Sequence, residues 1–202
     1  MPQSLRLITR QSAVALRAMV LLTVVLGLVY PLALTGIGQV LFPWQANGSL
    51  VHDASGQVVG SKLIGQAFVD ADGAPLPQYF QSRPSAAGDG YDGSASSGSN
   101  LGPNNPDLVA AIAERRAAVA EFNGVPESEV PADAVTASSS GLDPEISTAY
   151  AAIQVDRVAA ARGIEPSRVA DLVKENTSGI GYLSEVRVNV VELNLALDEL
   201  EG

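Results

Sequence analysis

The chain has 202 residues, with 12 basic and 22 acidic side chains and a formal net charge of −10. It has no cysteine, which excludes a disulfide framework, a zinc–thiolate site and thiol redox chemistry. The single histidine, His52, argues against a histidine-based metal or catalytic site, and the acidic balance argues against nucleic-acid binding. We therefore expect no metal site and no nucleic-acid partner.

An uncharged run from Ala18 to Phe42 stands out in the N-terminal part of the chain. A helix that crosses the hydrocarbon core needs about 20 mostly apolar residues, so the run predicts a transmembrane helix over residues 18–42, with a kink at Pro31. A cleaved signal peptide is the alternative, but signal-peptide cores span only about 7–15 residues. Ala33-Leu34-Thr35 is also a poor cleavage site.

The flanking charges predict the orientation of this helix. Arg6, Arg10 and Arg17 precede the run, and no acidic residue occurs before Asp53. Basic flanks stay on the cytoplasmic side. We expect a cytoplasmic basic arm over residues 1–17 and a single extracytoplasmic α+β domain over residues 43–202, on a single-pass protein of the bacterial inner (plasma) membrane, in contact with membrane lipid.

The first part of the domain has the pattern of short strands and turns. Segments 49–52 and 57–59 flank Asp53-Ala54-Ser55-Gly56, which predicts a hairpin. Leu63–Phe68 and Tyr79–Arg83 are further strand candidates, separated by a turn-rich stretch. The glycine-rich tract over 88–106 has the composition of a flexible linker, with an ordered binding loop as the alternative.

The second part has helical periodicity. Residues 107–123 predict a helix that Gly124 ends, and residues 143–162 predict a second one with Asp143 as N-cap and Pro144 in the first turn. A third helix is expected over 166–176, followed by an extended segment over 186–190. Residues 189–200 fit either a strand or a helix, and we favour the helix.

Four stretches carry a resemblance to a known family. Residues 79–85, 95–108, 131–147 and 187–198 read YFQSRPS, ASSGSNLGPNNPDL, PADAVTASSSGLDPEIS and RVNVVELNLALD. Together with the N-terminal apolar run, they make the chain similar to the KdpC family, the C subunits of bacterial Kdp potassium-transporting ATPases. The resemblance spans almost the whole chain.

The resemblance implies an accessory subunit without catalysis of its own, in an ATP-driven complex for high-affinity potassium uptake. The implied partners are KdpA, a channel-like subunit, KdpB, a P-type ATPase, and the small KdpF. The aspartyl phosphate and the ion path would lie in the other subunits, and this chain lacks the Asp-Lys-Thr-Gly motif of P-type pumps. A tethered binding protein that works without partners is the alternative from a different class.

The matched polar loops are the candidate partner interface. Their residues are Ser96, Ser97, Ser99, Asn100, Asn104, Ser138, Ser139 and Ser140, and Arg83 is a candidate for an ion pair across the interface. The alternative is that these side chains cap turns within the chain. The resemblance makes a plain linker at 88–106 the weaker interpretation.

The resemblance also implies a nucleotide role, because in this family a glutamine is proposed to assist ATP binding, as in the signature motif of ABC ATPases. Gln154, with Arg157 one turn later, is the candidate. We expect Gln154 beside the apolar face of its helix, where its amide is accessible. No firmly bound cofactor is expected, and an extracytoplasmic location would separate Gln154 from cytosolic ATP, which favours a hydrogen bond from the helix surface to a loop of a partner subunit instead.

Overall fold

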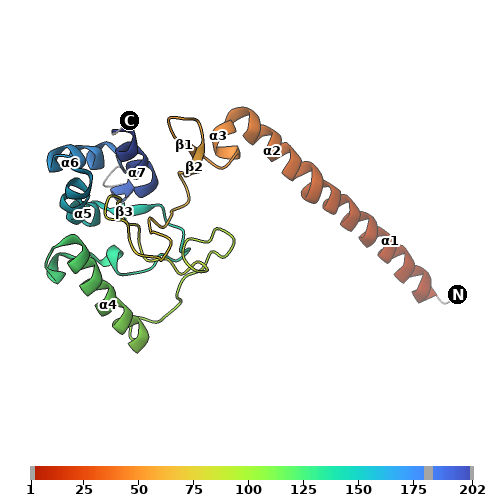
Figure 1. The fold of residues 1–202 in the computed structure, drawn as a ribbon. Coiled ribbons are helices and arrows are strands. Elements are labelled where there is room, and N and C mark those ends of the chain that lie inside the picture. The colour runs from red at the N-terminus through yellow and green to blue at the C-terminus, as the bar shows by residue number, and fades with distance from the viewer. Residues whose placement is uncertain (1–2, 180–183, 201–202) are drawn as a thin grey trace. The chain divides into compact units, whose positions relative to one another are not determined.

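The structure is a computed structural model that describes residues 3–179 and 184–200. It divides into two units, Met1–Ser49 and Leu50–Gly202. We call the second unit the C-terminal domain and describe the two separately. The first unit is helical, with α1 (Gln3–Val24), η1 (Val25–Val29), α2 (Tyr30–Leu41) and α3 (Pro43–Ala46) in succession (Figure 1).

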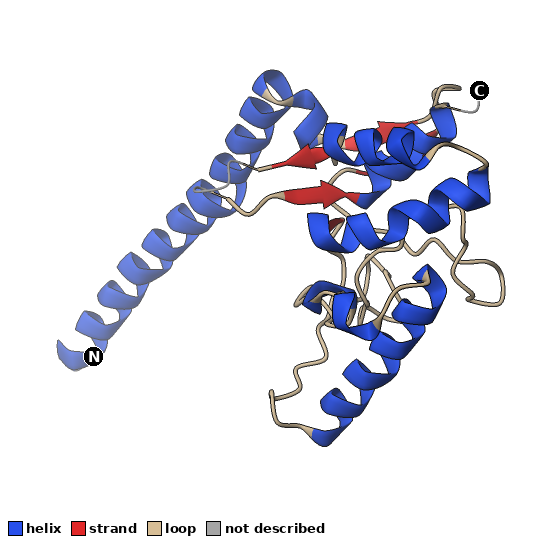
Figure 2. Ribbon diagram, turned by 90° about the vertical axis from the view of Figure 1, so that its left-hand side faces the viewer, coloured by secondary structure: helices blue, strands red, loops and turns tan. Residues whose placement is uncertain are grey.

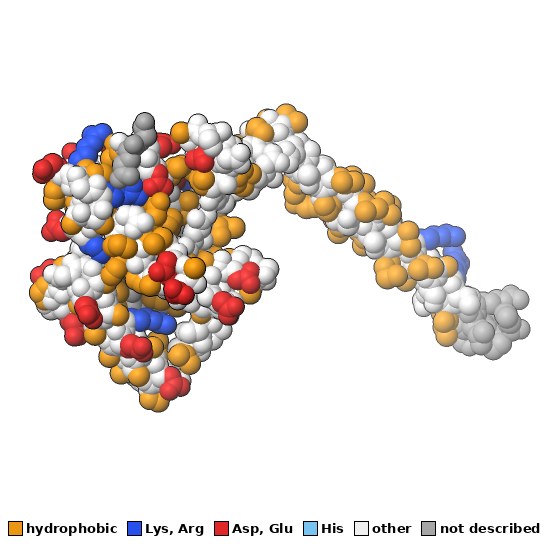
Figure 3. Space-filling view, viewed as in Figure 1, with side chains coloured by type: hydrophobic (Ala, Val, Ile, Leu, Met, Phe, Trp, Pro, Cys, Tyr) orange, Lys and Arg blue, Asp and Glu red, His pale blue; other side chains and the backbone are white. Residues whose placement is uncertain are grey.

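The long helix of the first unit has the length and composition of a membrane span. The span covers Leu7–Leu41, with a mean hydropathy of 2.3 in its most apolar window and none of that window buried. Hydrophobic side chains cover its length, and basic ones occur only toward its N-terminal end (Figure 3). The predicted run over 18–42 lies almost entirely within this helix, which begins earlier because the residues before Ala18 continue the same helix.

Pro31 distorts the helix without ending it. Proline has no N–H, and its ring crowds the carbonyl four residues earlier, here that of Gly27. The segment just upstream, η1, is a π-helical turn, in which the N–H of Tyr30 donates to the carbonyl of Val25. One extra residue in this turn accommodates the proline, so the distortion expected at Pro31 takes the form of a π-bulge.

The C-terminal domain begins with the predicted hairpin. Strands β1 (Leu50–His52) and β2 (Val58–Ser61) pair antiparallel. Asp53 organises the turn, because its Oδ1 accepts hydrogen bonds from the backbone N–H groups of Ser55 and Gln57, both at 2.9 Å. Gly56 takes a φ of 82°, which only glycine adopts without strain.

A second small sheet forms the centre of the domain. Strand β5 (Arg187–Asn189) lies between β3 (Glu145–Ser147) and β4 (Thr177–Ser178), and both neighbours are antiparallel to it. The strands are short, and helices and loops make up most of the domain (Figure 2). The extended segment predicted over 186–190 is confirmed as β5.

Helices α5 (Thr148–Arg162) and α7 (Val190–Glu199) pack against this sheet, α6 (Pro166–Glu175) packs on both of them, and α4 (Pro106–Asn123) packs on α5. Two 3₁₀ turns, η2 (Glu127–Glu129) and η3 (Ala132–Ala134), follow α4. The helices, strands and loops of the C-terminal domain bury one hydrophobic cluster. Its fully buried members include Phe80, Ile146, Val158, Val169, Val188, Leu193 and Leu197. The helix predicted over 189–200 is confirmed as α7.

Two predicted strands are wrong. Leu63–Phe68 is a loop with a single isolated bridge, between Ser61 and Ile64, and Leu63 is largely exposed. Tyr79–Arg83 belongs to no strand of the described residues, although Phe80 is fully buried. In both segments the residue types suit a strand, but no neighbouring strand is in place to pair with them.

The predicted start of the second helix is also wrong. Residues 145–147 form β3, and the helix begins at Thr148. Ser147 is its N-cap, since its Oγ accepts a hydrogen bond from the N–H of Tyr150 at 3.0 Å. Asp143 instead pairs with Arg83. The Asp-Pro pair resembles a helix start, but pairing of β3 with β5 keeps the backbone extended for three more residues.

Candidate functional site

The two polar loops that the sequence singled out lie against each other. The carbonyl of Ser140 accepts hydrogen bonds from the N–H of Ser97 at 2.9 Å and from the Oγ of Ser96 at 3.0 Å. At Gly98, a Cβ would lie 2.9 Å from the carbonyl oxygen of Ser139, so only glycine permits this approach. The first half of the glycine-rich tract is therefore an ordered loop, and the linker interpretation is wrong there.

The residues of these loops divide into two groups. Ser138 is buried, and its Oγ accepts a hydrogen bond from the N–H of Gly141 at 2.8 Å. The Oγ of Ser140 accepts one from the N–H of Leu142 at 3.1 Å, so both serines cap turns within the chain. The remaining candidates are exposed at the surface: Ser96, Ser97, Ser99, Asn100, Asn104 and Ser139.

Arg83 joins these loops to the rest of the domain. Its Nη1 lies 3.0 Å from Oδ2 of Asp143, and its Nη2 donates to the carbonyl of Thr136 at 3.3 Å. The Nε of Arg83 is buried and has no hydrogen-bond acceptor among the described residues. Tyr91 supports the segment by donating its hydroxyl to the carbonyl of Arg83 at 2.8 Å, and burial raises the pKa of Tyr91 to about 12. The ion pair that the structure gives Arg83 is thus within the chain.

Gln154 is fully buried, which corrects the expectation of an accessible amide beside the apolar face. Its Oε1 accepts a hydrogen bond from the N–H of Gln81 at 2.7 Å, and its Nε2 donates to the carbonyl of Gln81 at 3.2 Å. Both ends of the amide are therefore bound to the backbone of one residue. The hydrogen bond predicted to a loop of a partner subunit is instead made to a loop of this chain.

Asn194 makes the equivalent contact from α7. Its Oδ1 accepts a hydrogen bond from the N–H of Phe80 at 2.8 Å, and its Nδ2 donates to the carbonyl of Phe80 at 3.0 Å. We call Asn194 and Gln154, with the backbone of Phe80 and Gln81, the amide clamp. Successive residues of an extended chain point their polar groups to opposite sides, so α7 satisfies one residue and α5 the next.

The amide clamp explains why Tyr79–Arg83 has the sequence of a strand but lies in no sheet. Two side-chain amides take the place of neighbouring strands. Asn194 was not among the candidate residues predicted from the sequence, although the sequence holds a signal for it. It is the polar residue on the otherwise apolar buried side of α7, between Val190 and Leu197, and buried amides need partners.

Arg157 supports the clamp from the next turn of α5. Its Nη2 donates to Oε1 of Gln154 at 2.8 Å, and its Nη1 donates to the carbonyl of Tyr79 at 3.0 Å. Its Nε donates to Oδ1 of Asn123 at 2.9 Å, and the guanidinium lies 4.4 Å from the ring centroid of Phe122. Burial lowers the pKa of Arg157 to about 10, so the side chain stays charged at neutral pH. All three of its nitrogens are bound within the domain.

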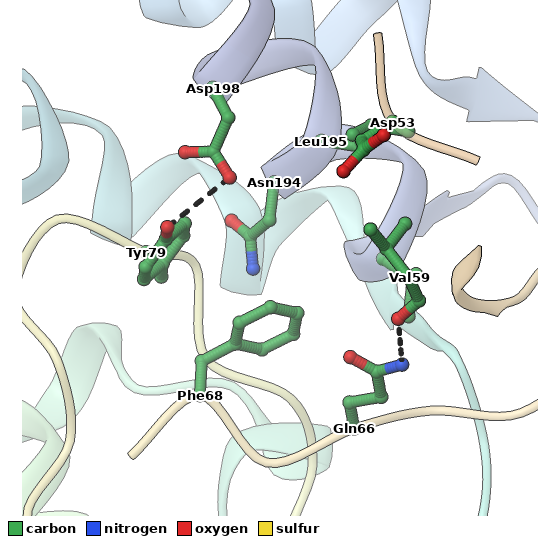
Figure 4. A pocket seen from close by; sticks show the side chains of 9 residues that line it. Asp53, Val59, Gln66, Phe68, Tyr79, Asn194, Leu195 and Asp198 are labelled. Carbon is green, nitrogen blue, oxygen red and sulfur yellow. Dashed lines mark hydrogen bonds between the residues drawn. The ribbon is translucent and has the colours of Figure 1, made fainter. Parts of the chain in front are cut away.

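A hollow of about 360 Å³ lies beside the clamp, between the hairpin and α7 (Figure 4). The rings of Phe68 and Tyr79 lie 5.4 Å apart at its wall. Asp198 at its rim accepts a hydrogen bond from the hydroxyl of Tyr79 at 3.2 Å and forms an ion pair with Arg162 at 2.6 Å. Its carboxylate is thus already neutralised by contacts within the chain.

The described residues, 3–179 and 184–200, contain no group of three or more His, Asp or Glu side chains with the spacing of a metal site. A second cavity, of about 460 Å³, lies beside α4 and includes Arg83 and Arg115 in its lining. The geometry therefore offers polar loops for contact and several hollows, of which these two are lined by candidate residues or lie beside the amide clamp.

Comparison with known proteins gives one family. The family model described as "KdpC: K+-transporting ATPase, c chain" matches residues 12–199. Proteins named potassium-transporting ATPase KdpC subunit are similar along nearly their full length. The one from Beijerinckia indica is 55% identical over 183 residues, covering 90% of this chain and 89% of that protein.

Two further relatives agree. The protein of the same name from Caulobacter vibrioides is 53% identical over 186 residues, covering 91% of this chain and 90% of that protein. The one from Mycobacterium tuberculosis is 52% identical over 194 residues, covering 95% of this chain and 99% of that protein. The chain therefore belongs to the KdpC family and is a subunit of a potassium-transporting ATPase complex.

Proposed function

We propose that this chain is a non-catalytic subunit that stabilises the potassium-uptake complex, by docking the C-terminal domain on the channel-like partner, KdpA, at the extracellular side. KdpB and KdpF complete the partner set. The observation that carries the proposal is the pair of polar loops. Their backbones are fixed by contacts within the chain, while Ser99, Asn100 and Ser139 keep their side chains exposed. A pre-ordered polar surface loses little entropy on binding.

A charge substitution on the loops tests the docking role. The double variant Ser99→Arg with Ser139→Arg places two long cations on the proposed surface, whereas Ser128→Arg puts one on the exposed turn η2 as a control. We expect the double variant to lower co-purification of the partner subunits at least about tenfold, equivalent to about 1.4 kcal/mol. Normal assembly of the double variant would contradict docking through these loops.

Co-purification from native membranes also tests the class of protein. If a tagged wild-type chain is purified without any pump subunit, the chain is a tethered binding protein that works without partners. If the pump subunits co-purify, that alternative is excluded. We expect the pump subunits to co-purify, since the relatives are named as subunits of a potassium-transporting ATPase.

The proposed orientation rests on charge asymmetry. Arg10 and Arg17 lie in the N-terminal half of the apolar helix, and every acidic residue lies beyond it. The chain has no cysteine, so a cysteine placed at Ser55 or Ser167 is the only thiol to label. Both should react with an impermeant reagent in intact cells. Labelling at both positions only after lysis would show that the C-terminal domain lies in the cytoplasm, opposite to the proposed orientation.

The competing proposal is that Gln154 and Arg157 bind ATP and raise the ATP affinity of the pump. A nucleotide contact at Gln154 would require the amide to leave Gln81, because both ends of the amide are in use. We therefore favour a positioning role for Gln154. Gln154→Ala in an assembled pump should leave the Michaelis constant for ATP unchanged.

Asn194→Ala is the matched control for this experiment. It breaks the other half of the amide clamp and leaves both candidate nucleotide-binding residues, Gln154 and Arg157, in place. If Gln154→Ala raises the Michaelis constant for ATP and Asn194→Ala does not, the nucleotide role is supported. An equal rise in both variants would mean that the fold of the clamp is what matters.

A further inference from the structure

The cavity beside α4 has a composition unlike the surface around it. Its volume is about 460 Å³, within the range of about 300–1,000 Å³ that is typical of ligand pockets. Much of its wall is apolar, and the lining comes from segments far apart in sequence, including Pro75, Val119, Phe122 and Tyr150. It is therefore a formed site rather than a gap in one loop.

The charged residues of this lining are both basic. Arg83 and Arg115 line the cavity, and none of the described aspartates and glutamates does so, in a chain with a net charge of −10. Arg115 donates from Nη1 to the carbonyl of Val135 at 3.2 Å and makes no ion pair with any described residue. The Nε of Arg83 is buried without an acceptor. Arg115 thus retains donors that the described chain does not satisfy, whereas Arg83 already forms an ion pair with Asp143 through Nη1.

We propose that this cavity binds the carboxylate side chain of an aspartate or glutamate from a partner subunit, with an apolar residue of the same segment against Val119 and Phe122. Carboxylates match the planar donor arrangement of arginine. The uncompensated charge of Arg115 favours an acidic occupant, and the apolar wall favours one with an adjoining hydrophobic side chain. The inference rests on the proposed docking role and names a second contact surface for it.

Arg83 connects this site to the polar loops. It lines the cavity, while its Nη1 holds Asp143, the residue that follows the Ser138–Leu142 turn. An occupant that accepts a hydrogen bond from Arg83 would hold this arginine in place and so fix the loop that it supports. The two proposed contacts with the partner would then strengthen each other.

Photo-cross-linking in the assembled complex tests the proposal. Ala118 is exposed and lines the cavity, whereas Ala117 is exposed on the same helix and does not line it. We expect p-benzoylphenylalanine at position 118, but not at position 117, to cross-link to a partner-subunit peptide that contains aspartate or glutamate. A peptide without an acidic residue, a second copy of this chain, equal yields at both positions, or no cross-link in an assembled complex would overturn the proposal.

A charge reversal provides the second measurement. Arg115→Glu should lower the yield of the cross-link from position 118 at least about tenfold, which corresponds to about 1.4 kcal/mol. Arg168→Glu makes the same charge change on the exposed face of α6 and should leave the yield unchanged. Restoration by an acidic-to-arginine change at the cross-linked partner position would complete the argument. Equal yields in both variants would contradict it.

A free small carboxylate is the remaining occupant to test. Benzoate is the probe, added to the purified full-length chain in detergent while thermal unfolding is followed. Stabilisation that Arg115→Gln abolishes, in the absence of any cross-link, would assign the cavity to a small molecule and overturn the proposal. If the wild-type complex fails to assemble, the docking role fails as well. An assembled complex without a cross-link overturns this inference alone.

Discussion

The membrane helix and the C-terminal domain satisfy their polar backbone groups in different ways. Over Leu7–Leu41 each turn of helix bonds to the next, and the apolar side chains all point outward. In the C-terminal domain, the extended segment around Phe80 has no such local partner and depends on amides from two helices. Composition alone therefore specifies the first region, while single residues far apart in sequence decide the second.

The largest effect is expected from breaking the amide clamp. Asn194→Ala leaves the buried N–H and carbonyl of Phe80 without partners, at a cost of about 1–3 kcal/mol for each group. We expect the free energy of unfolding to fall by about 2–6 kcal/mol, measured by urea denaturation of the full-length chain in detergent. A loss below about 1 kcal/mol would mean that water replaces the amide.

Asn194→Asp sharpens this test. The aspartate keeps an oxygen for the N–H of Phe80 but presents a second oxygen to its carbonyl, where the asparagine donated. Burial without a donor favours the protonated carboxyl, so the pKa of this aspartate should be raised. The variant should then gain stability relative to wild type as the pH falls, because only the protonated form can donate.

The same leucine-to-arginine substitution should have a large effect in the apolar helix and almost none on an exposed loop of the C-terminal domain. Leu26→Arg places a charge in the middle of the apolar helix, at a cost of about 2.5–3.5 kcal/mol for insertion. Leu63→Arg places it on an exposed loop of the C-terminal domain and should change stability by less than about 0.5 kcal/mol. Membrane fractionation measures the first and urea denaturation the second. Full insertion of Leu26→Arg would show that this helix does not face lipid.

Alkaline pH should weaken the domain through Tyr91. Burial raises the pKa of Tyr91 to about 12, above about 10 in the unfolded chain. The folded state then holds a proton that the unfolded state has lost, so the stabilisation is complete below pH of about 10 and disappears as the pH rises through about 12. The loss should reach about 3 kcal/mol, since each pH unit between the two pKa values corresponds to about 1.36 kcal/mol. Tyr91→Phe should reduce the slope of stability against pH in this window, and an unchanged slope would assign it to Tyr150, whose pKa burial also raises.

Elements that depend on contacts between residues close in sequence were predicted correctly, whereas an element that depends on distant residues was not. The long apolar helix, the hairpin at Asp53 and α4 with its Gly124 cap depend on contacts within a few residues, and all were predictable. The strand assignment of Tyr79–Arg83 failed because its partners are side chains 73 and 114 residues further along the chain.

The candidate site was predictable only in outline. The polar loops could be chosen by their resemblance to the family, but their pairing depends on Gly98 and Gly141, which let two backbones approach. Gln154 was placed wrongly, because a helical wheel shows only the angle of a side chain. Its burial depends on the loop that covers it. The cavity beside α4 could not be predicted from the sequence, because its lining residues come from segments that lie far apart along the chain.

The smallest expected effect comes from removing the N-cap of α5, which tests whether the helix starts after Ser147, as observed, or at Asp143, as predicted from the sequence. Ser147→Ala removes the N-cap of α5 and its bond from Oγ to Oδ1 of Asp133, at 2.8 Å. Loss of such a cap costs about 1 kcal/mol. Thr148→Ala, one residue later, is the control, because Thr148 is exposed and its helical position needs no side-chain acceptor. Urea denaturation should therefore show a loss at Ser147 and almost none at Thr148. Equal losses would mean that the start of α5 is stabilised by β3 and its pairing with β5, and that the serine hydroxyl contributes little.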